Sequence, residues 1–183
     1  MLNPDGVVAG NYRTSLFGKD LNRTFNQSRK YAFPEIFHLL DYTKKLKKEH
    51  KQRFSIYLDL HGHSVKKNVF FYGPDYNIAH NFYSQSRDYA KILGNLTPMF
   101  RYYSCIFRIS NEKSTTARAT LNRVVDIPFT YTLESSNGAF YDSLDHSEKP
   151  FTVQYWVEMG AIVAKGLGIW LESQKKPTIQ KKK

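Results

Sequence analysis

The feature that most constrains the fold is an alternation of short apolar runs with longer amphipathic segments. The short runs are rich in aromatic and β-branched side chains, as is typical of strands, and the longer segments carry apolar residues at helical spacing. The predicted strands are 54–60, 68–72, 103–109 and 127–133, and the predicted helices are 33–50, 77–95, 115–125 and 153–171. This order predicts an α/β fold with a mixed, largely parallel sheet flanked by helices.

The last predicted helix has one distinctly apolar face. Its members are Val153, Trp156, Val157, Gly160, Ala161, Ala164 and Leu167. We expect this face to pack in the core. Residues 1–172 are then expected to form one domain, and the basic segment 173–183 is expected to be a disordered tail.

The chain of 183 residues has a formal net charge of +11, which favours an acidic partner. Part of this charge lies on a lysine-rich helical face, for which simple solvation is the ordinary interpretation. No motif supports nucleic-acid binding, and no apolar run approaches the roughly 20 residues that span a membrane. The single cysteine, Cys105, favours a reducing compartment, so we expect a cytoplasmic protein.

Polar residues follow two of the predicted strands. The sequence DLHGHS at 59–64 is predicted to form a turn after the first strand, and Glu134 ends the strand 127–133. Reactive groups collect at the carboxyl ends of strands in open α/β sheets, so both sites are candidates for chemistry. Taken alone, His61 fits a hydrogen-bonded turn histidine equally well, and Glu134 fits an ion-paired strand end.

Five motifs occur in a fixed order along the chain. They are NPDG at 3–6, GNYR at 10–13, DLNR at 20–23, DLHGHS at 59–64 and YTLE at 131–134. Together they resemble the zinc metallocarboxypeptidases, and within these the cytosolic carboxypeptidases that remove glutamate from tubulin. The resemblance runs from Met1 to about Gly168 and implies a metallocarboxypeptidase-like fold that lacks its N-terminal part.

The resemblance also implies roles for individual residues. His61 matches a zinc ligand, with Asp59 nearby as support, and Glu134 matches the general base that moves a proton to the leaving amine. Arg13 matches the arginine that polarises the scissile carbonyl. His63 matches no ligand and is interpreted as a structural residue.

Substrate-binding residues are implied in the same way. Asn22 and Arg23 match the pair that holds the terminal carboxylate of the substrate, for which a guanidinium is well suited. Arg118 lies where the subfamily carries an arginine that pairs with an acidic side chain at the substrate's C-terminus. Ser114 or Thr115 replaces a glycine of that motif.

The resemblance places two further zinc ligands in an HxxE motif upstream of NPDG. None of the six histidines has a glutamate at the third following position. We therefore expect an N-terminally truncated chain that binds Zn²⁺ weakly and does not hydrolyse peptides by itself. The lost strands are expected to leave an exposed sheet edge.

Three functions remain open at this point. The first is a carboxypeptidase domain acting on acidic polypeptide C-termini, such as tubulin tails, with microtubule or cilium association. The second is a non-catalytic binding module for acidic tails. The third is a related zinc amidohydrolase, against which the DLNR and GNYR forms argue. No membrane or nucleic-acid partner is expected.

Overall fold

The computed structural model describes residues 1–27, 29–53 and 55–175 and divides into two compact units. The first unit contains Met1–Asp59, Gly73–Asp75 and Phe107–Thr132. The second contains Leu60–Tyr72, Tyr76–Ile106 and the chain from Leu133 onward. Within the described ranges, no helix combines the length and apolarity that crossing a membrane requires.

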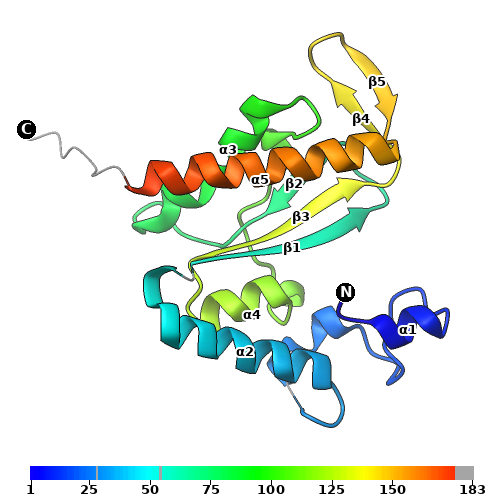
Figure 1. The fold of residues 1–183 in the computed structure, drawn as a ribbon, viewed down its shortest axis with the longest axis vertical. Coiled ribbons are helices and arrows are strands. Elements are labelled where there is room, and N and C mark those ends of the chain that lie inside the picture. The colour runs from blue at the N-terminus through cyan, green and yellow to red at the C-terminus, as the bar shows by residue number, and fades with distance from the viewer. Residues whose placement is uncertain (28, 54, 176–183) are drawn as a thin grey trace, which may run out of the picture. The chain divides into compact units, whose positions relative to one another are not determined.

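Five α-helices and five strands are labelled in Figure 1. The helices are α1 (Pro4–Val8), α2 (Pro34–His50), α3 (Phe82–Leu96), α4 (Ala117–Val124) and α5 (Val153–Lys175). The strands are β1 (Ile56–His63), β2 (Val69–Tyr72), β3 (Phe129–Ser136), β4 (Ala139–Asp142) and β5 (Ser147–Pro150). Short 3-10 turns lie at Leu21–Arg23, Phe25–Gln27, Lys51–Arg53, Tyr102–Ser104 and Asn111–Lys113.

The first unit is built around the apolar sides of α2 and α4. Helix α2 begins at Pro34, where the fixed φ of proline suits the first helical turn, and ends in a basic last turn that complements the helix dipole. Its buried residues join a core formed by Leu21, Phe25, Phe33, Ile36, Leu40, Ala117, Leu121, Val125 and Ile127. The 3-10 turns within and just after DLNR therefore pack into the same core as the two helices.

The larger sheet has the strand order β1-β3-β2. The Phe129 amide donates to the Ser55 carbonyl, and the Asn137 amide donates to the His63 carbonyl, each at 3.0 Å. The sequence offset is the same in both bonds, so β1 and β3 are parallel. The arrow of β2 points the other way in Figure 1. The α/β fold with a mixed sheet is therefore confirmed, and in the described residues β1 is an edge strand.

The prediction of a turn at DLHGHS is wrong, because β1 continues through His63. Pairing with the Asn137 amide extends the ladder. Gly62 permits the close approach, since a Cβ there would lie 2.6 Å from the Asn137 Oδ1 atom. Likewise Glu134 lies inside β3, two residues before its end.

Two other predicted elements differ from the structure. Residues 103–109 do not form a strand, because a 3-10 turn at Tyr102–Ser104 bends the chain and leaves only isolated bridges to β2. Helix α3 starts at Phe82 rather than 77. There the Asn77 Oδ1 atom accepts from the Ala79 amide and the His80 Nδ1 atom from the Phe82 amide, and such local bonds compete with helix formation.

Helices α3 and α5 pack together in the second unit. The Tyr89 hydroxyl donates to the Val163 carbonyl at 3.0 Å, and the Trp170 indole donates to the Gln85 carbonyl at 3.4 Å. Gly166 allows the close approach, because a Cβ there would lie 2.5 Å from Leu93 Cδ2. Burial also raises the pKa of the Tyr89 phenol, so this hydroxyl keeps its proton.

The predicted core face of α5 is largely exposed, which corrects the sequence prediction. Val153 is 72% exposed, Val157 63% and Trp156 42%. The buried residues of the helix are instead Met159, Gly166 and Trp170. Apolar residues therefore occur on both sides of α5, and the smaller side that carries Gly166 is the one that meets α3.

The helix also runs past its predicted end. It continues to Lys175, where Lys175 pairs with Glu172 at 2.7 Å and the Ser173 hydroxyl donates to the Trp170 carbonyl. The first three residues of the predicted tail, 173–175, are thus helical. Residues 176–183 lie outside the described part of the chain.

The β4–β5 hairpin was not predicted. Its strands pair antiparallel from Ala139–Pro150 to Asp142–Ser147. Lys149 bonds both Asp142 and Asp145 across the turn, and bonds from Lys149 and Ser147 hold the pKa of Asp145 at about 2.

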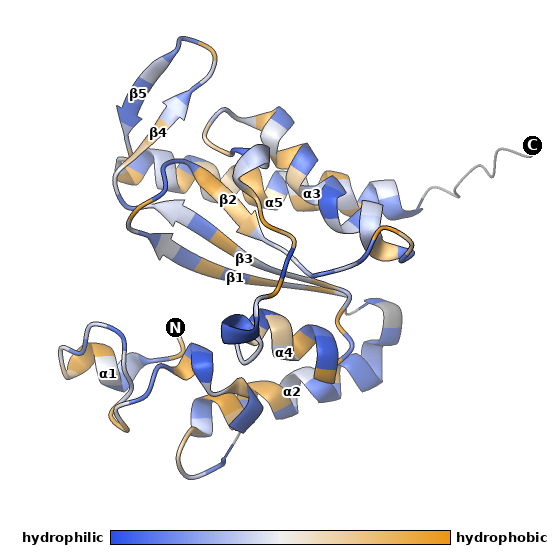
Figure 2. Ribbon diagram, turned by 180° about the vertical axis from the view of Figure 1, so that it is seen from behind, coloured by the Kyte–Doolittle hydropathy of each residue, from blue (hydrophilic) through white to orange (hydrophobic). Residues whose placement is uncertain are grey.

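Figure 2 shows that hydrophobic residues concentrate in β2, whereas polar and apolar residues alternate along β1.

The α3–α5 contact gives a prediction about two neighbouring glycines. Gly166→Ala should destabilise the protein by about 1–3 kcal/mol, because the added methyl overlaps Leu93. Gly168→Ala, whose Cβ has no neighbour within 4 Å, should stabilise it by up to about 1 kcal/mol through helix propensity. Urea unfolding followed by far-UV circular dichroism measures both. Equal effects of the two substitutions would contradict the proposed packing.

Candidate functional site

The paired strands β1 and β3 present one polar face. Along β1, side chains alternate so that Tyr57, Asp59, His61 and His63 share a face, with Ile56, Leu58 and Leu60 on the other. Along β3, Thr130, Thr132, Glu134 and Ser136 share a face in the same way. This alternation concentrates titratable and hydroxyl side chains on one side of the strand pair.

His61 and Glu134 are directly opposite each other in the parallel ladder. The bond from the Asn137 amide to the His63 carbonyl sets the register. In a parallel ladder, a residue that donates its amide lies opposite the residue after the one whose carbonyl accepts, so Asn137 lies opposite Ser64. Counting back three residues on each strand pairs His61 with Glu134. Opposed residues point to the same face, so the structure brings the predicted metal ligand and the predicted general base together.

The two side chains differ in exposure. Glu134 is 9% exposed, whereas His61 is half-buried. A carboxylate at this depth needs polar partners, and both residues have interactions within the chain. The pair thus combines a shielded carboxylate with an imidazole that solvent can reach.

His63 has the structural role expected of it. Its Nδ1 atom accepts from the backbone amides of Val65 and Lys66, at 3.2 and 2.9 Å, and its ring contacts Phe70 edge-on. An Nδ1 atom that accepts carries no proton, so any proton of the neutral ring is on Nε2. His63 therefore shapes the turn that follows β1.

Within the first unit, the NPDG and GNYR motifs are joined by Asn3. The Asn3 side chain accepts from the Gly6 amide at 3.2 Å and donates to the Thr14 carbonyl at 3.0 Å. Gly6 lies so close that a Cβ would be 2.4 Å from the Thr14 carbonyl oxygen. The loop after Arg13 is thus held against α1, which explains why the two motifs occur together.

Arg13 is linked to the DLNR motif by an ion pair. Its Nε atom lies 2.6 Å from the Asp20 Oδ2 atom, and the other Asp20 oxygen accepts from the Asn22 amide at 2.9 Å. The arginine is exposed, so the pair adds little to stability and mainly fixes the direction of the guanidinium. Asp20 was missed as an orienting residue, although an aspartate just before a 3-10 turn is a recognisable capping signal.

Asn22 connects the DLNR turn to helix α4. Its Oδ1 atom accepts from the Ala117 amide at 2.8 Å, at the first residue of the helix. Arg23 donates from Nη1 to the Asn22 carbonyl at 2.8 Å. Asn22 and Arg23 are therefore neighbours in one hydrogen-bonded network of the first unit, and Arg118 directly follows the residue whose amide Asn22 holds.

Arg118 is the most buried of these residues, at 4% exposure. Its guanidinium donates to the Gly73 carbonyl. Thr116 caps the helix that carries it, with its hydroxyl oxygen accepting from the Ala119 amide, so Ser114 and Thr115 are not needed as the cap. The departure from the family's glycine in this motif is compatible with a well-formed helix start.

A complete metal centre is not found among the described residues. A catalytic zinc ion takes three protein ligands, and the chain outside 28, 54 and 176–183 contains no group of three His, Cys, Asp or Glu side chains placed to hold a metal. The role of His61 as one ligand of such a site stays a prediction. The described residues alone do not fit a zinc centre.

Comparison with known proteins points to carboxypeptidases. The chain is 38% identical over 138 residues to cytosolic carboxypeptidase 3 of Bos taurus, and 39% identical over 139 residues to cytosolic carboxypeptidase 2 of Homo sapiens. These alignments cover 74% and 75% of the chain but only 14% and 15% of the relatives. No family profile matches the chain.

Solved structures with the same fold are bacterial carboxypeptidases. The metallo-carboxypeptidase from Burkholderia cenocepacia has a TM-score of 0.73 at 19% identity, and that from Pseudomonas aeruginosa, in complex with (2-guanidinoethylmercapto)succinic acid, has 0.72 at 21%. The matches cover 94% and 93% of this chain, and 43% and 44% of the bacterial ones. At this identity they establish the fold.

The Asn22–Ala117 bond gives a prediction that separates its structural role from any substrate contact. Asn22→Ala should lower the free energy of unfolding by about 1–2 kcal/mol, because the buried start of α4 loses its acceptor. Asn22→Asp keeps an oxygen in place and should remain within about 0.5 kcal/mol of the native protein. Urea unfolding at constant m value measures both, and similar losses in the two variants would refute the assignment.

Proposed function

Because the chain belongs to the cytosolic carboxypeptidases within the metallocarboxypeptidase family, we propose that the protein carrying it removes acidic residues from polypeptide C-termini. Glutamate is the proposed leaving residue and tubulin tails are the proposed substrates. The proposal extends to a cytoplasmic location with microtubule or cilium association, in keeping with relatives that are named cytosolic.

The observation that carries the proposal is the opposition of His61 and Glu134 on the polar face of β1 and β3. A buried carboxylate fixed on a strand can accept a proton from an attacking water and return it to the amine of the leaving residue. Zn²⁺ is the proposed cofactor, with His61 as one ligand. When bound, the ion would supply Lewis-acid activation.

The network around DLNR supports an exopeptidase. Removal of a C-terminal residue requires recognition of its free carboxylate, and Arg23 next to Asn22 offers a planar donor for this purpose. Arg13, directed by Asp20, is the proposed donor to the scissile carbonyl. Arg118 is proposed to select an acidic side chain, and the net charge of +11 favours an acidic substrate.

A second candidate is a non-catalytic binding module for acidic tails. It is favoured by the finding that the described residues hold no group of three metal ligands. Purified protein offered peptides that end in glutamate separates the two functions, because only an enzyme releases free glutamate. N-acetylated amino acids belong in the same panel, and cleavage of these alone would instead support the amidohydrolase.

The role of Glu134 is tested by Glu134→Gln. We expect turnover of a glutamate-terminated peptide to fall by about 10²–10⁴, because the amide cannot take up the proton. Peptide affinity should stay within about twofold, since the substitution preserves size and removes no carboxylate-binding group. The measurement is glutamate release together with equilibrium binding. Turnover close to that of the native protein would exclude Glu134 as the base.

Arg118 is tested through specificity rather than through total activity. Arg118→Ala should lower the ratio of kcat/KM for glutamate-ended to leucine-ended peptides by about 10- to 100-fold, the worth of a charge-assisted hydrogen bond. Arg118→Lys keeps the charge but lacks the planar guanidinium, so it should lower this ratio by less. Because Arg118 also donates to the Gly73 carbonyl, thermal unfolding must show that both variants fold. An unchanged ratio in folded variants removes Arg118 from the specificity site.

A further inference from the structure

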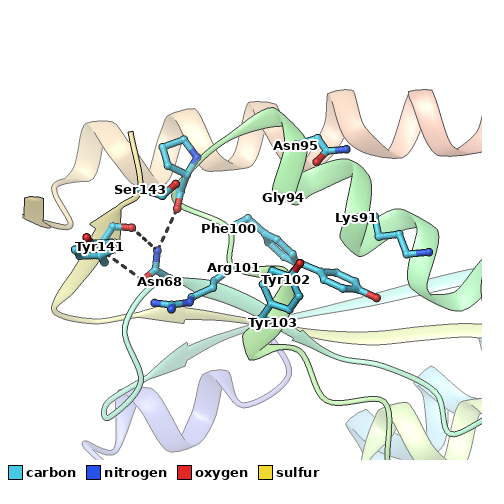
Figure 3. Close-up of a pocket in the computed structure, with 11 residues that line it drawn as sticks. Asn68, Lys91, Gly94, Asn95, Phe100, Arg101, Tyr102, Tyr103, Tyr141 and Ser143 are labelled. Carbon is cyan, nitrogen blue, oxygen red and sulfur yellow. Dashed lines mark hydrogen bonds between the residues drawn. The ribbon is translucent and has the colours of Figure 1, made fainter. Parts of the chain in front are cut away.

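A pocket that none of the roles above uses lies wholly within the second unit (Figure 3). It has a volume of about 570 Å³ and is formed by the C-terminal half of α3, the 3-10 turn Tyr102–Ser104 and the beginning of the β4–β5 turn. A volume of this size can hold several residues of a peptide or a comparable ligand.

The walls of the pocket are fixed by the buried side chain of Asn68. Its Nδ2 atom donates to the carbonyls of Pro98 and Tyr141, at 3.1 and 3.0 Å, and its Oδ1 atom accepts from the Tyr141 amide at 3.1 Å. Gly94 lies next to the turn, where an added Cβ would be in van der Waals contact with Tyr102 Cβ at 3.4 Å. The pocket is therefore formed before any ligand binds.

The charge of the lining is positive. Lys91 and Arg101 contribute cations, and none of the described residues that line the pocket carries a carboxylate. In the described chain, the Arg101 side chain makes no hydrogen bond or ion pair. Lys91 has only an exposed contact with Asp88 at 3.3 Å, which is worth little in water.

The acidic residues of the adjoining hairpin are already neutralised. Lys149 lies 2.7 Å from Asp142 and 2.6 Å from Asp145, and Lys67 pairs with Glu148. These carboxylates therefore compete weakly for Arg101, and the local field favours an anion.

The remaining lining adds hydrogen-bond donors and flat apolar surface. Tyr102 and Tyr103 offer rings and hydroxyls, Asn95 an amide and Ser143 a hydroxyl. Cations at the rim together with amide and hydroxyl donors suit carboxylate side chains on a flexible backbone. Tyr103 is 93% exposed, so a ligand could cover its ring on binding.

The pocket is within reach of the His61–Glu134 pair. Asn68 follows His61 by seven residues, and Tyr141 follows Glu134 by seven. Seven extended residues span at most about 25 Å, so a peptide of about eight residues could occupy both places.

We propose that this pocket binds acidic residues of a polypeptide upstream of its C-terminus, as a second contact for the substrate of the proposed carboxypeptidase. The ligand is a run of glutamate or aspartate side chains. The proposal rests on the proposed function for the identity of the ligand, but the binding itself requires no catalysis.

The test is fluorescence anisotropy with a labelled decaglutamate peptide whose C-terminus is amidated. Asn22 and Arg23, the proposed ligands of a free C-terminal carboxylate, then have no such group to bind. We expect Arg101→Gln to weaken binding at least fivefold and Lys91→Ala at least twofold. Lys165→Ala, which removes an exposed lysine from α5 in the same unit, should change binding by less than twofold. Equal effects of Lys91→Ala and Lys165→Ala would show binding by net charge and overturn the proposal.

A variant that keeps the charge isolates the pocket itself. Ser143→Trp should fill the space and weaken decaglutamate at least threefold, while thermal unfolding shows an intact fold. No effect of Ser143→Trp in a folded protein would reject the pocket. Tighter binding of a single-stranded oligonucleotide than of decaglutamate would also overturn the proposal, in favour of a nucleic-acid ligand.

Failure of the pocket and failure of the enzyme are distinguishable. If the amidated peptide binds at the pocket but no glutamate is released from a free-acid peptide, the binding proposal stands and the carboxypeptidase proposal falls. If glutamate is released and Arg101→Gln changes neither affinity nor KM, the enzyme stands and the pocket proposal falls.

Discussion

The parallel pairing of β1 with β3 is the interaction on which the candidate chemistry depends. Two backbone bonds with one sequence offset fix the register along the full length of both strands. That register places His61 opposite Glu134, and a slip of one residue would turn one of the two side chains to the other face. Gly62 and Asn137 keep the pairing intact as far as the end of the motif. The fold thus positions these two groups through backbone hydrogen bonds.

Sequence reasoning succeeded where the determining contacts are local. The start of α2 is set by Pro34 in its own first turn, that of α4 is set in part by the adjacent cap Thr116, and the motifs identified the candidate residues. It failed where distant partners decide. The extension of β1 through His63 depends on Asn137, and the hairpin after Gly138 is fastened by Asn68. A side chain that bonds a strand 73 residues away leaves no periodic signal in the sequence.

Helix α5 shows a related limit of pattern analysis. Periodicity revealed an apolar face, but it could not reveal which neighbour covers that face. In the structure the helix meets α3 through Gly166 and Trp170, and the residues Val153 and Val157 remain exposed. Exposed apolar faces of this kind mark contact surfaces. The described residues leave this face of α5 largely uncovered. The bacterial carboxypeptidases of the same fold are more than twice as long as the part that this chain matches.

The positive charge of the chain acts on two length scales. Exposed lysines, such as Lys45 beside Asp41 on α2, are screened over about 8 Å at physiological salt, so they can raise the rate at which an acidic chain arrives but not select its residues. Selection requires cations whose direction is fixed. Arg118 is held by the Gly73 carbonyl, and Arg13 is held by Asp20 of the DLNR motif. Under the proposed function, net charge favours the approach of an acidic polypeptide, and discrimination among such polypeptides depends on these few oriented guanidinium groups.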